Sequence, residues 1–155
     1  MTESFKDFYL NSSGIYVAAR VSKSSQESIE KYILANKIPV PTANLKEARK
    51  HCTIVYSRKY APVEVFPTAS YTCLSTKLDV FISDGKSCLV LKLNCPEISK
   101  RHSDIYSQHD LTYDFPTYIP HITLSYDIGD FDWQKLPQFV DELILDSEYK
   151  ENLKE

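Results

Sequence analysis

Glycine is scarce in this chain, whose 155 residues include only Gly14, Gly85 and Gly129, far apart from one another. A G-x-G-x-x-G fingerprint or a P-loop needs several glycines close together, because the backbone must approach the phosphates of the nucleotide. Neither motif can be written with three isolated glycines. The sequence therefore excludes the folds that hold phosphate in a glycine-rich loop, and any phosphate bound here must be held by side chains or by helix ends.

Long apolar runs and an excess of basic charge are also missing. No stretch approaches the ~18 apolar residues that cross a bilayer, and the start, MTESFKDFYL, has neither the basic beginning nor the apolar core of a signal peptide. We therefore expect no membrane partner and a cytoplasmic location. The net charge of −3 disfavours a long nucleic acid as partner, because proteins that bind one usually present a basic surface.

The cysteines are few and scattered: Cys52, Cys73, Cys88 and Cys95. No two of them form a C-x-x-C pair, so the spacing typical of a zinc site is absent and we expect no metal cofactor. In a chain without a secretory signal, we expect reduced and mostly buried thiols.

The remaining pattern predicts one α+β domain over residues 1–155. Asp84-Gly85 is a hairpin signal, and Ser24 followed by Glu27 is a capping box at the start of a helix. The charged tail, 150–155, is expected to be frayed. The predicted strands are 15–21, 51–56, 69–74, 77–82, 88–93, 122–126 and 143–148, and the predicted helices are 25–36, 96–108, a short one over 133–136 and a short stretch around 45–50.

Strand–helix–strand occurs twice, and each copy ends in a strand that opens with His-x-Thr. His51-Cys52-Thr53-Ile54 and His121-Ile122-Thr123-Leu124 share the order His, apolar, Thr, apolar. Residues i and i+2 of a strand point to the same face, so the histidine and the threonine of each motif project together. The apolar residues between them point the other way, into a core.

Two imidazoles and two hydroxyls on neighbouring strands would form an acid–base set. Imidazole has a pKa near 6.5, so one ring can be neutral while the other is protonated at neutral pH. Such a pair can carry out phosphoryl chemistry without a metal, and the threonine hydroxyls would hold the non-bridging oxygens. The competing interpretation is two histidines at the edge of a core, which the matched strand context disfavours.

Paired H-Φ-T-Φ strands in a small α+β chain resemble the two-histidine phosphoesterase superfamily, which includes RNA 2′,5′-ligase-like proteins and cyclic phosphodiesterases. The resemblance implies a bilobal fold, with two β-sheet lobes of pseudo-two-fold symmetry flanking a central groove and helices outside. It implies that His51, Thr53, His121 and Thr123 are catalytic. It also implies metal-independent action, without a cofactor, on phosphodiesters that involve a ribose 2′ position.

The start FKDFYLNSSGIYVAARVS and the end LILDSEYKENL are similar to the phage anti-CBASS nucleases of this superfamily, which degrade cyclic di- and trinucleotide messengers of bacterial immunity. This resemblance implies substrate-binding roles for Tyr16 and Glu148, and a location in the host cytoplasm. Tyr16 shares a strand face with Arg20, so both could line the groove. The alternative for Glu148 is a solvated charge in an acidic tail.

We therefore expect an enzyme that cleaves the 3′,5′ linkages of cyclic di- or trinucleotides. One histidine removes the proton of a ribose 2′-hydroxyl, which attacks the adjacent phosphate, and the other protonates the leaving 5′-oxygen. The sequence leaves open which histidine is the base, which bases the substrate carries and the oligomeric state. Two alternatives stay open: an enzyme for RNA ends, 2′,3′-cyclic phosphates or 2′,5′-oligoadenylates, and a module that binds a nucleotide without cleaving it.

Overall fold

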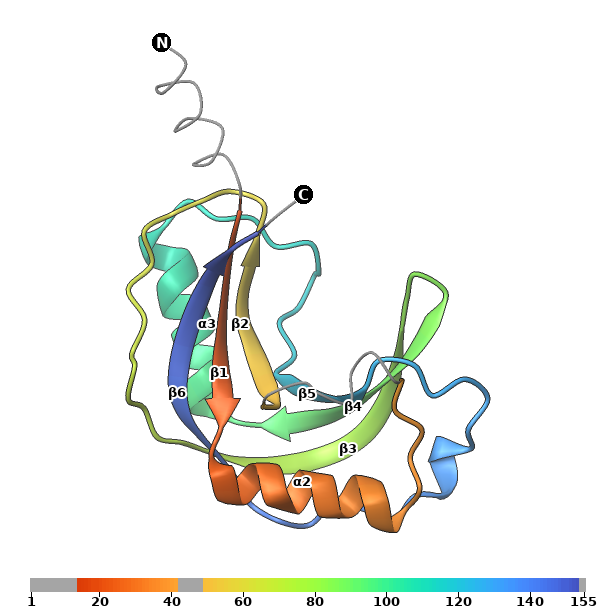
Figure 1. The fold of residues 1–155 in the computed structure, drawn as a ribbon. Coiled ribbons are helices and arrows are strands. Elements are labelled where there is room, and N and C mark those ends of the chain that lie inside the picture. The colour runs from red at the N-terminus through yellow and green to blue at the C-terminus, as the bar shows by residue number, and fades with distance from the viewer. Residues whose placement is uncertain (1–13, 42–48, 154–155) are drawn as a thin grey trace.

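The computed structural model of the chain describes residues 14–41 and 49–153 (Figure 1). The elements within these ranges follow the predicted order and confirm the α+β class. Most of the helical stretch expected around 45–50, and the N-terminal residues up to 13, lie outside the described residues. The elements are β1 (Ile15–Val21), α2 (Lys23–Ala35), β2 (His51–Ser57), β3 (Tyr71–Ser83), β4 (Lys86–Asn94), α3 (Pro96–Gln108), β5 (His121–Ser125), the 3₁₀ helix η2 (Trp133–Lys135) and β6 (Leu143–Asn152).

The six strands pair antiparallel in one sheet that closes on itself in the order β1-β2-β5-β4-β3-β6. β2 and β5 are joined by the single residue pair Cys52↔Ile122, and β3 and β6 by three pairs. The two lobes expected from the sequence are therefore not separate sheets. The groups β6-β1-β2 and β5-β4-β3 are continuous with each other at two joints (Figure 1).

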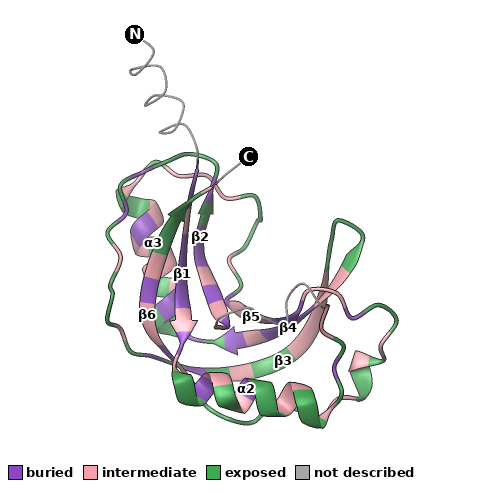
Figure 2. Ribbon diagram, viewed as in Figure 1, coloured by how far each residue is buried: buried purple, intermediate pink, exposed green. Residues whose placement is uncertain are grey.

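Both helices bury one face against the sheet, and the core lies between them and the strands (Figure 2). Ile29 of α2 and Ile98 and Ile105 of α3 are at most 1% exposed. Burial of side chains of this size contributes roughly 2 kcal/mol each. α2 is also bonded to the start of β6, because the Ile144 N–H donates to Ser25 Oγ over 2.8 Å. Both helices therefore pack on the outside of the sheet and stabilise it.

The first helix begins earlier than predicted. Ser22 is its N-cap, with extended backbone, and its hydroxyl accepts a hydrogen bond from the Ser25 N–H over 3.2 Å. Ser24, which the sequence indicated as the cap, lies within the helix. A serine two residues upstream satisfies a free N–H of the first turn equally well, so the capping-box pattern was assigned to the wrong serine.

The predicted strands 69–74 and 77–82 form one strand, β3, and the last strand, β6, is longer than expected. β3 is continuous through a register shift between Ser75 and Lys77, where a bulge keeps the chain paired with β4. β6 does not fray at residue 150 but pairs with β1 as far as Asn152. The hairpin signal is confirmed, since Asp84 and Gly85 both have positive φ, as a two-residue type I′ turn requires.

All four cysteines are free, and Cys52, Cys73 and Cys95 are buried while Cys88 is partly exposed, as expected for reduced thiols. Burial raises the pKa of the Cys52 thiol to about 12, so it stays uncharged. In the part of the chain that the structure describes, no helix has the length and apolar character to cross a bilayer.

Candidate active site

The two His-x-Thr motifs lie side by side, because β2 and β5 pair at the central residues of the motifs. On either side of the pair Cys52↔Ile122, antiparallel geometry sets the histidine of each strand opposite the threonine of the other. Cys52 and Ile122 are both 0% exposed, whereas the flanking histidines and threonines are partly exposed. The alternation expected from the sequence therefore brings His51, Thr53, His121 and Thr123 to one face.

Tyr16 joins this face from β1. Its hydroxyl oxygen lies 2.9 Å from Thr53 Oγ1, and its ring is edge-on to the His51 ring with centroids 6.2 Å apart. Burial raises the pKa of the Tyr16 phenol, which therefore keeps its proton. The structure thus brings five of the six predicted site residues together.

His121 is held by the backbone just before its own strand. Its Nδ1 lies 2.8 Å from the Ile119 carbonyl oxygen. A carbonyl only accepts, so Nδ1 carries the proton, and in the neutral ring Nε2 is the atom with a free lone pair. Burial keeps the pKa of His121 below its ordinary value, although the hydrogen bond to Ile119 acts in the opposite direction. The electrostatic effects of His51 and Lys92 lower this pKa further.

Glu148 lies on the opposite face of the sheet and is 3% exposed. Its carboxylate accepts hydrogen bonds from Arg101 Nη2 over 2.9 Å, from the Tyr71 hydroxyl over 2.5 Å and from the Phe66 N–H over 3.0 Å. The structure therefore does not bring Glu148 to the other five residues. A solvated charge is also wrong, because this carboxylate is buried and paired.

Three side chains on the face of the histidines were missed by the sequence analysis. Tyr149 lies edge-on to His51 with ring centroids 6.3 Å apart, and Phe81 lies edge-on to His121 at 5.1 Å. Lys92 is the strand partner of His121. The signal was strand alternation: Tyr149 follows Glu148 directly, so the two side chains must face opposite ways.

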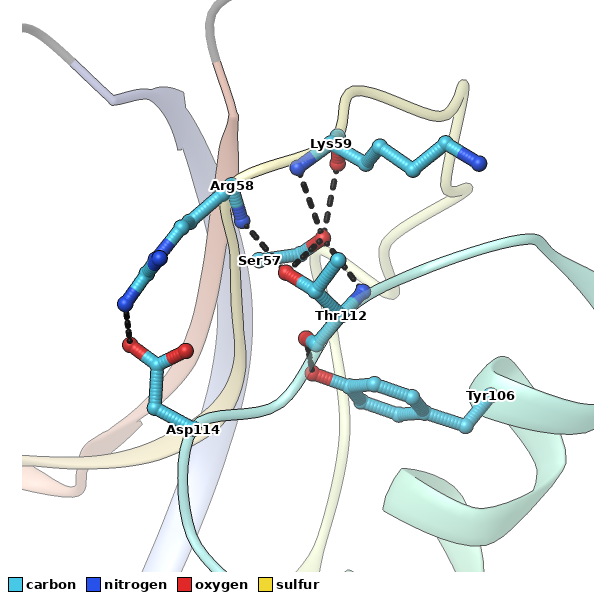
Figure 3. A network of polar contacts seen from close by, with 6 residues as sticks. All are labelled: Ser57, Arg58, Lys59, Tyr106, Thr112 and Asp114. Carbon is cyan, nitrogen blue, oxygen red and sulfur yellow. Dashed lines mark hydrogen bonds and ion pairs between the residues drawn. The ribbon is translucent and has the colours of Figure 1, made fainter.

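The segment over residues 109–120, which leads into β5, is hydrogen-bonded to the C-terminal end of β2 (Figure 3). Thr112 Oγ1 accepts from the Arg58 N–H over 2.8 Å, and the Thr112 N–H donates to Ser57 Oγ over 2.9 Å. Arg58 forms an ion pair with Asp114 over 3.0 Å, and the Tyr106 hydroxyl donates to the Thr112 carbonyl. Lys59 also pairs with a carboxylate of this segment, Asp110.

The same segment is tied to the middle of β2 by Tyr118. Its hydroxyl donates to the Thr53 carbonyl over 2.6 Å, and its ring is stacked on the His102 ring with centroids 3.9 Å apart. Ile119, whose carbonyl holds His121, is the next residue along the chain. The two motifs are therefore linked through Tyr118 as well as through the Cys52↔Ile122 pair.

The described residues contain no group of three or more His, Cys, Asp and Glu side chains arranged to hold a metal ion. The site offers imidazoles, hydroxyls and nearby cations instead. This arrangement can exchange protons and bind an anion.

Fold and site together define a small α+β protein with two paired His-x-Thr strands on one face of a closed sheet. Residues 13–155 match the family described as "Anti-CBASS protein Acb1", and the chain belongs to this family. It is 38% identical to the anti-CBASS protein Acb1 of Salmonella phage S16 and 36% identical to that of Enterobacteria phage T4, in each case over 97% of this chain and 93% of the relative. The protein of the same name from Vibrio phage KVP40 is 33% identical over 77% of this chain and 76% of its own length. The similarity to phage anti-CBASS proteins expected from the sequence is thus confirmed.

Proposed function

We propose that this protein is a metal-independent phosphodiesterase that cleaves the 3′,5′ linkages of cyclic di- and trinucleotide messengers, and that it acts against CBASS immunity in the cytoplasm of the host cell. The observation that carries the proposal is the pairing of β2 with β5 at Cys52↔Ile122, which brings the two His-x-Thr motifs to one face. The phage relatives, each named an anti-CBASS protein, support the biological role.

In the proposed reaction His121 is the first base. The bond from Nδ1 to the Ile119 carbonyl and the lowered pKa favour a neutral ring with Nε2 as acceptor. Nε2 takes the proton of a ribose 2′-hydroxyl, whose oxygen attacks the adjacent phosphorus. His51 donates a proton to the leaving 5′-oxygen, and a 2′,3′-cyclic phosphate results. Water can then open this product with the two roles exchanged.

Thr53 and Thr123 bind the non-bridging oxygens of the phosphate and offset the charge that develops there. The Tyr16 hydroxyl, 2.9 Å from Thr53 Oγ1, orients the first of these hydroxyls. The two groups β6-β1-β2 and β5-β4-β3 each supply one motif, which supports a mechanism that uses the two histidines as a pair.

The test is analysis of products after incubation with cyclic dinucleotides and trinucleotides of several base compositions. We expect the wild type to give products with 2′,3′-cyclic or monophosphate ends, and EDTA to leave the rate unchanged. His51→Ala and His121→Ala should each lower the rate by about 10²–10⁴. His109→Ala, which changes a histidine at the end of α3, is the matched control.

Other outcomes identify the alternatives. Analogues with 2′-deoxyribose must resist cleavage, and if they are cut at the same rate the 2′-hydroxyl is not the nucleophile. Cleavage confined to linear 2′,3′-cyclic phosphates or 2′,5′-oligoadenylates would favour the RNA-end enzyme. Recovery of unchanged cyclic nucleotide from a stable complex would favour a binding module.

A further inference from the structure

Each histidine of the paired motifs has a cation as its partner on the neighbouring outer strand. Arg20 of β1 is the strand partner of His51, and Lys92 of β4 is the strand partner of His121. Paired residues in an antiparallel sheet lie on the same face. Both cations therefore lie on the face of the motifs, one on each side of the two histidines.

Each cation also lies against an aromatic ring that touches the same histidine. The Arg20 guanidinium carbon is 3.9 Å from the centre of the Tyr149 ring, and Tyr149 is edge-on to His51. The Lys92 ammonium is 5.8 Å from the centre of the Phe81 ring, and Phe81 is edge-on to His121. These contacts hold the two cations beside the histidines through cation–π attraction.

Across the closed sheet the side chains thus follow a mirrored order. Strands β6, β1, β2, β5, β4 and β3 are consecutive neighbours. They carry, in that order, an aromatic ring, a cation, a histidine, a histidine, a cation and an aromatic ring. The sequence does not show this order, because the order depends on pairing between strands such as β1 and β6 that are far apart along the chain.

We propose that Arg20 and Lys92 bind the phosphates of the nucleotide from the two sides of the histidine pair, an inference that rests on the proposed function. Stacking on Tyr149 uses the face of the guanidinium, whereas its N–H donors lie in the plane and match phosphate oxygens. Lys92 donates to Asp79 over 2.8 Å, and an ammonium has two further donors after that bond. A nucleotide with two phosphodiester groups can engage both cations, whereas a mononucleotide has a phosphate for only one side.

The experiment measures binding of cyclic dinucleotides that contain 2′-deoxyribose, which lack the attacking hydroxyl and stay intact. Arg20→Met and Lys92→Met should each weaken binding about tenfold, and each should make the affinity less dependent on salt. Lys92→Arg keeps the charge and should retain most of the affinity, whereas Arg20→Lys keeps the charge but loses the stacked planar donors and should bind with an affinity between those of the wild type and Arg20→Met. Lys100→Met is the control, because Lys100 lies exposed on α3 beside Asp104 and should bind like the wild type.

Thermal unfolding of each variant separates loss of binding from loss of fold, and Arg20→Gln and Lys92→Gln replace any methionine variant that does not fold. If either cation variant binds like the wild type, or if Lys100→Met loses as much affinity, the assignment of the paired cations is wrong. If the wild type neither binds nor cleaves any cyclic nucleotide, the proposed function itself fails. The two failures are therefore distinguishable.

Discussion

The hydroxyl of Tyr16 lies 2.9 Å from that of Thr53, so a residue of β1 fixes the orientation of a hydroxyl in the first His-x-Thr motif. Tyr16→Phe removes this bond and leaves the shape of the ring unchanged. We expect a loss of about 1 kcal/mol in the free energy of unfolding. We also expect a lower kcat, because Thr53 is no longer oriented.

Urea unfolding and steady-state kinetics on a cyclic dinucleotide measure the two effects of Tyr16→Phe. Tyr60→Phe is the control, since Tyr60 is 37% exposed. A variant with reduced stability but an unchanged kcat would show that Tyr16 is part of the scaffold only.

Tyr118 and Tyr106 both fix the position of the segment over residues 109–120, but at different places along it. The Tyr118 hydroxyl bonds to Thr53, beside the motifs, whereas the Tyr106 hydroxyl bonds to Thr112, away from them. Tyr118→Phe and Tyr106→Phe should each cost about 1 kcal/mol in unfolding free energy. Only Tyr118→Phe should also lower kcat, and equal effects of the two changes on kcat would contradict the link between the motifs.

Two partly buried histidines are expected to make the stability depend on pH. The pKa values of His121 and His102 are lowered in the folded state, mainly by burial, so between these values and about 6.5 the unfolded chain holds protons that the folded chain does not. The free energy of unfolding therefore falls as pH drops below about 6.5, by at most roughly 1.4 kcal/mol per pH unit for each histidine. Below the folded-state values this dependence ends.

His121→Asn should lessen that loss, because it removes one of the two groups. Urea unfolding at several pH values between 7.5 and 5 gives the difference between variant and wild type. A difference that does not change over this range would contradict the lowered pKa of His121.

Glu148 is expected to act on stability rather than on substrate binding. Glu148→Gln leaves Arg101, whose side chain is 14% exposed, without its counter-charge, and the loss of one partner of a buried pair costs about 3–5 kcal/mol. The double change Glu148→Leu with Arg101→Met should cost less than the sum of the single changes. Thermal unfolding and KM, measured well below the transition, check this. A raised KM in a fully folded Glu148→Gln variant would instead support the substrate-binding role of Glu148 that the family resemblance implied.

The faces of the two motifs were predictable from the sequence because strand alternation is a local rule. His51 and Thr53 had to project together once the residue between them was in the core. The pairing of β2 with β5 was not predictable, since the register between strands that are distant along the chain depends on the packing of the whole sheet. Arg20 was found by alternation within β1, and alternation within β6 gives the face of Tyr149 relative to Glu148, whereas Lys92 needed the strand order. The resemblance identified Glu148 without fixing which face of β6 it occupies, and the structure places it on the face away from the histidines.

The joint between β2 and β5 is the weakest in the ring of strands, with one residue pair where β3 and β4 share nine. Local opening is cheapest where the fewest backbone bonds must break, so motion of the native state should concentrate at this joint. A molecule that binds both β2 and β5 adds contacts between two strands that share only one residue pair. A ligand that binds both strands in the folded state alone therefore stabilises the protein, by an amount that grows with its free concentration relative to its Kd.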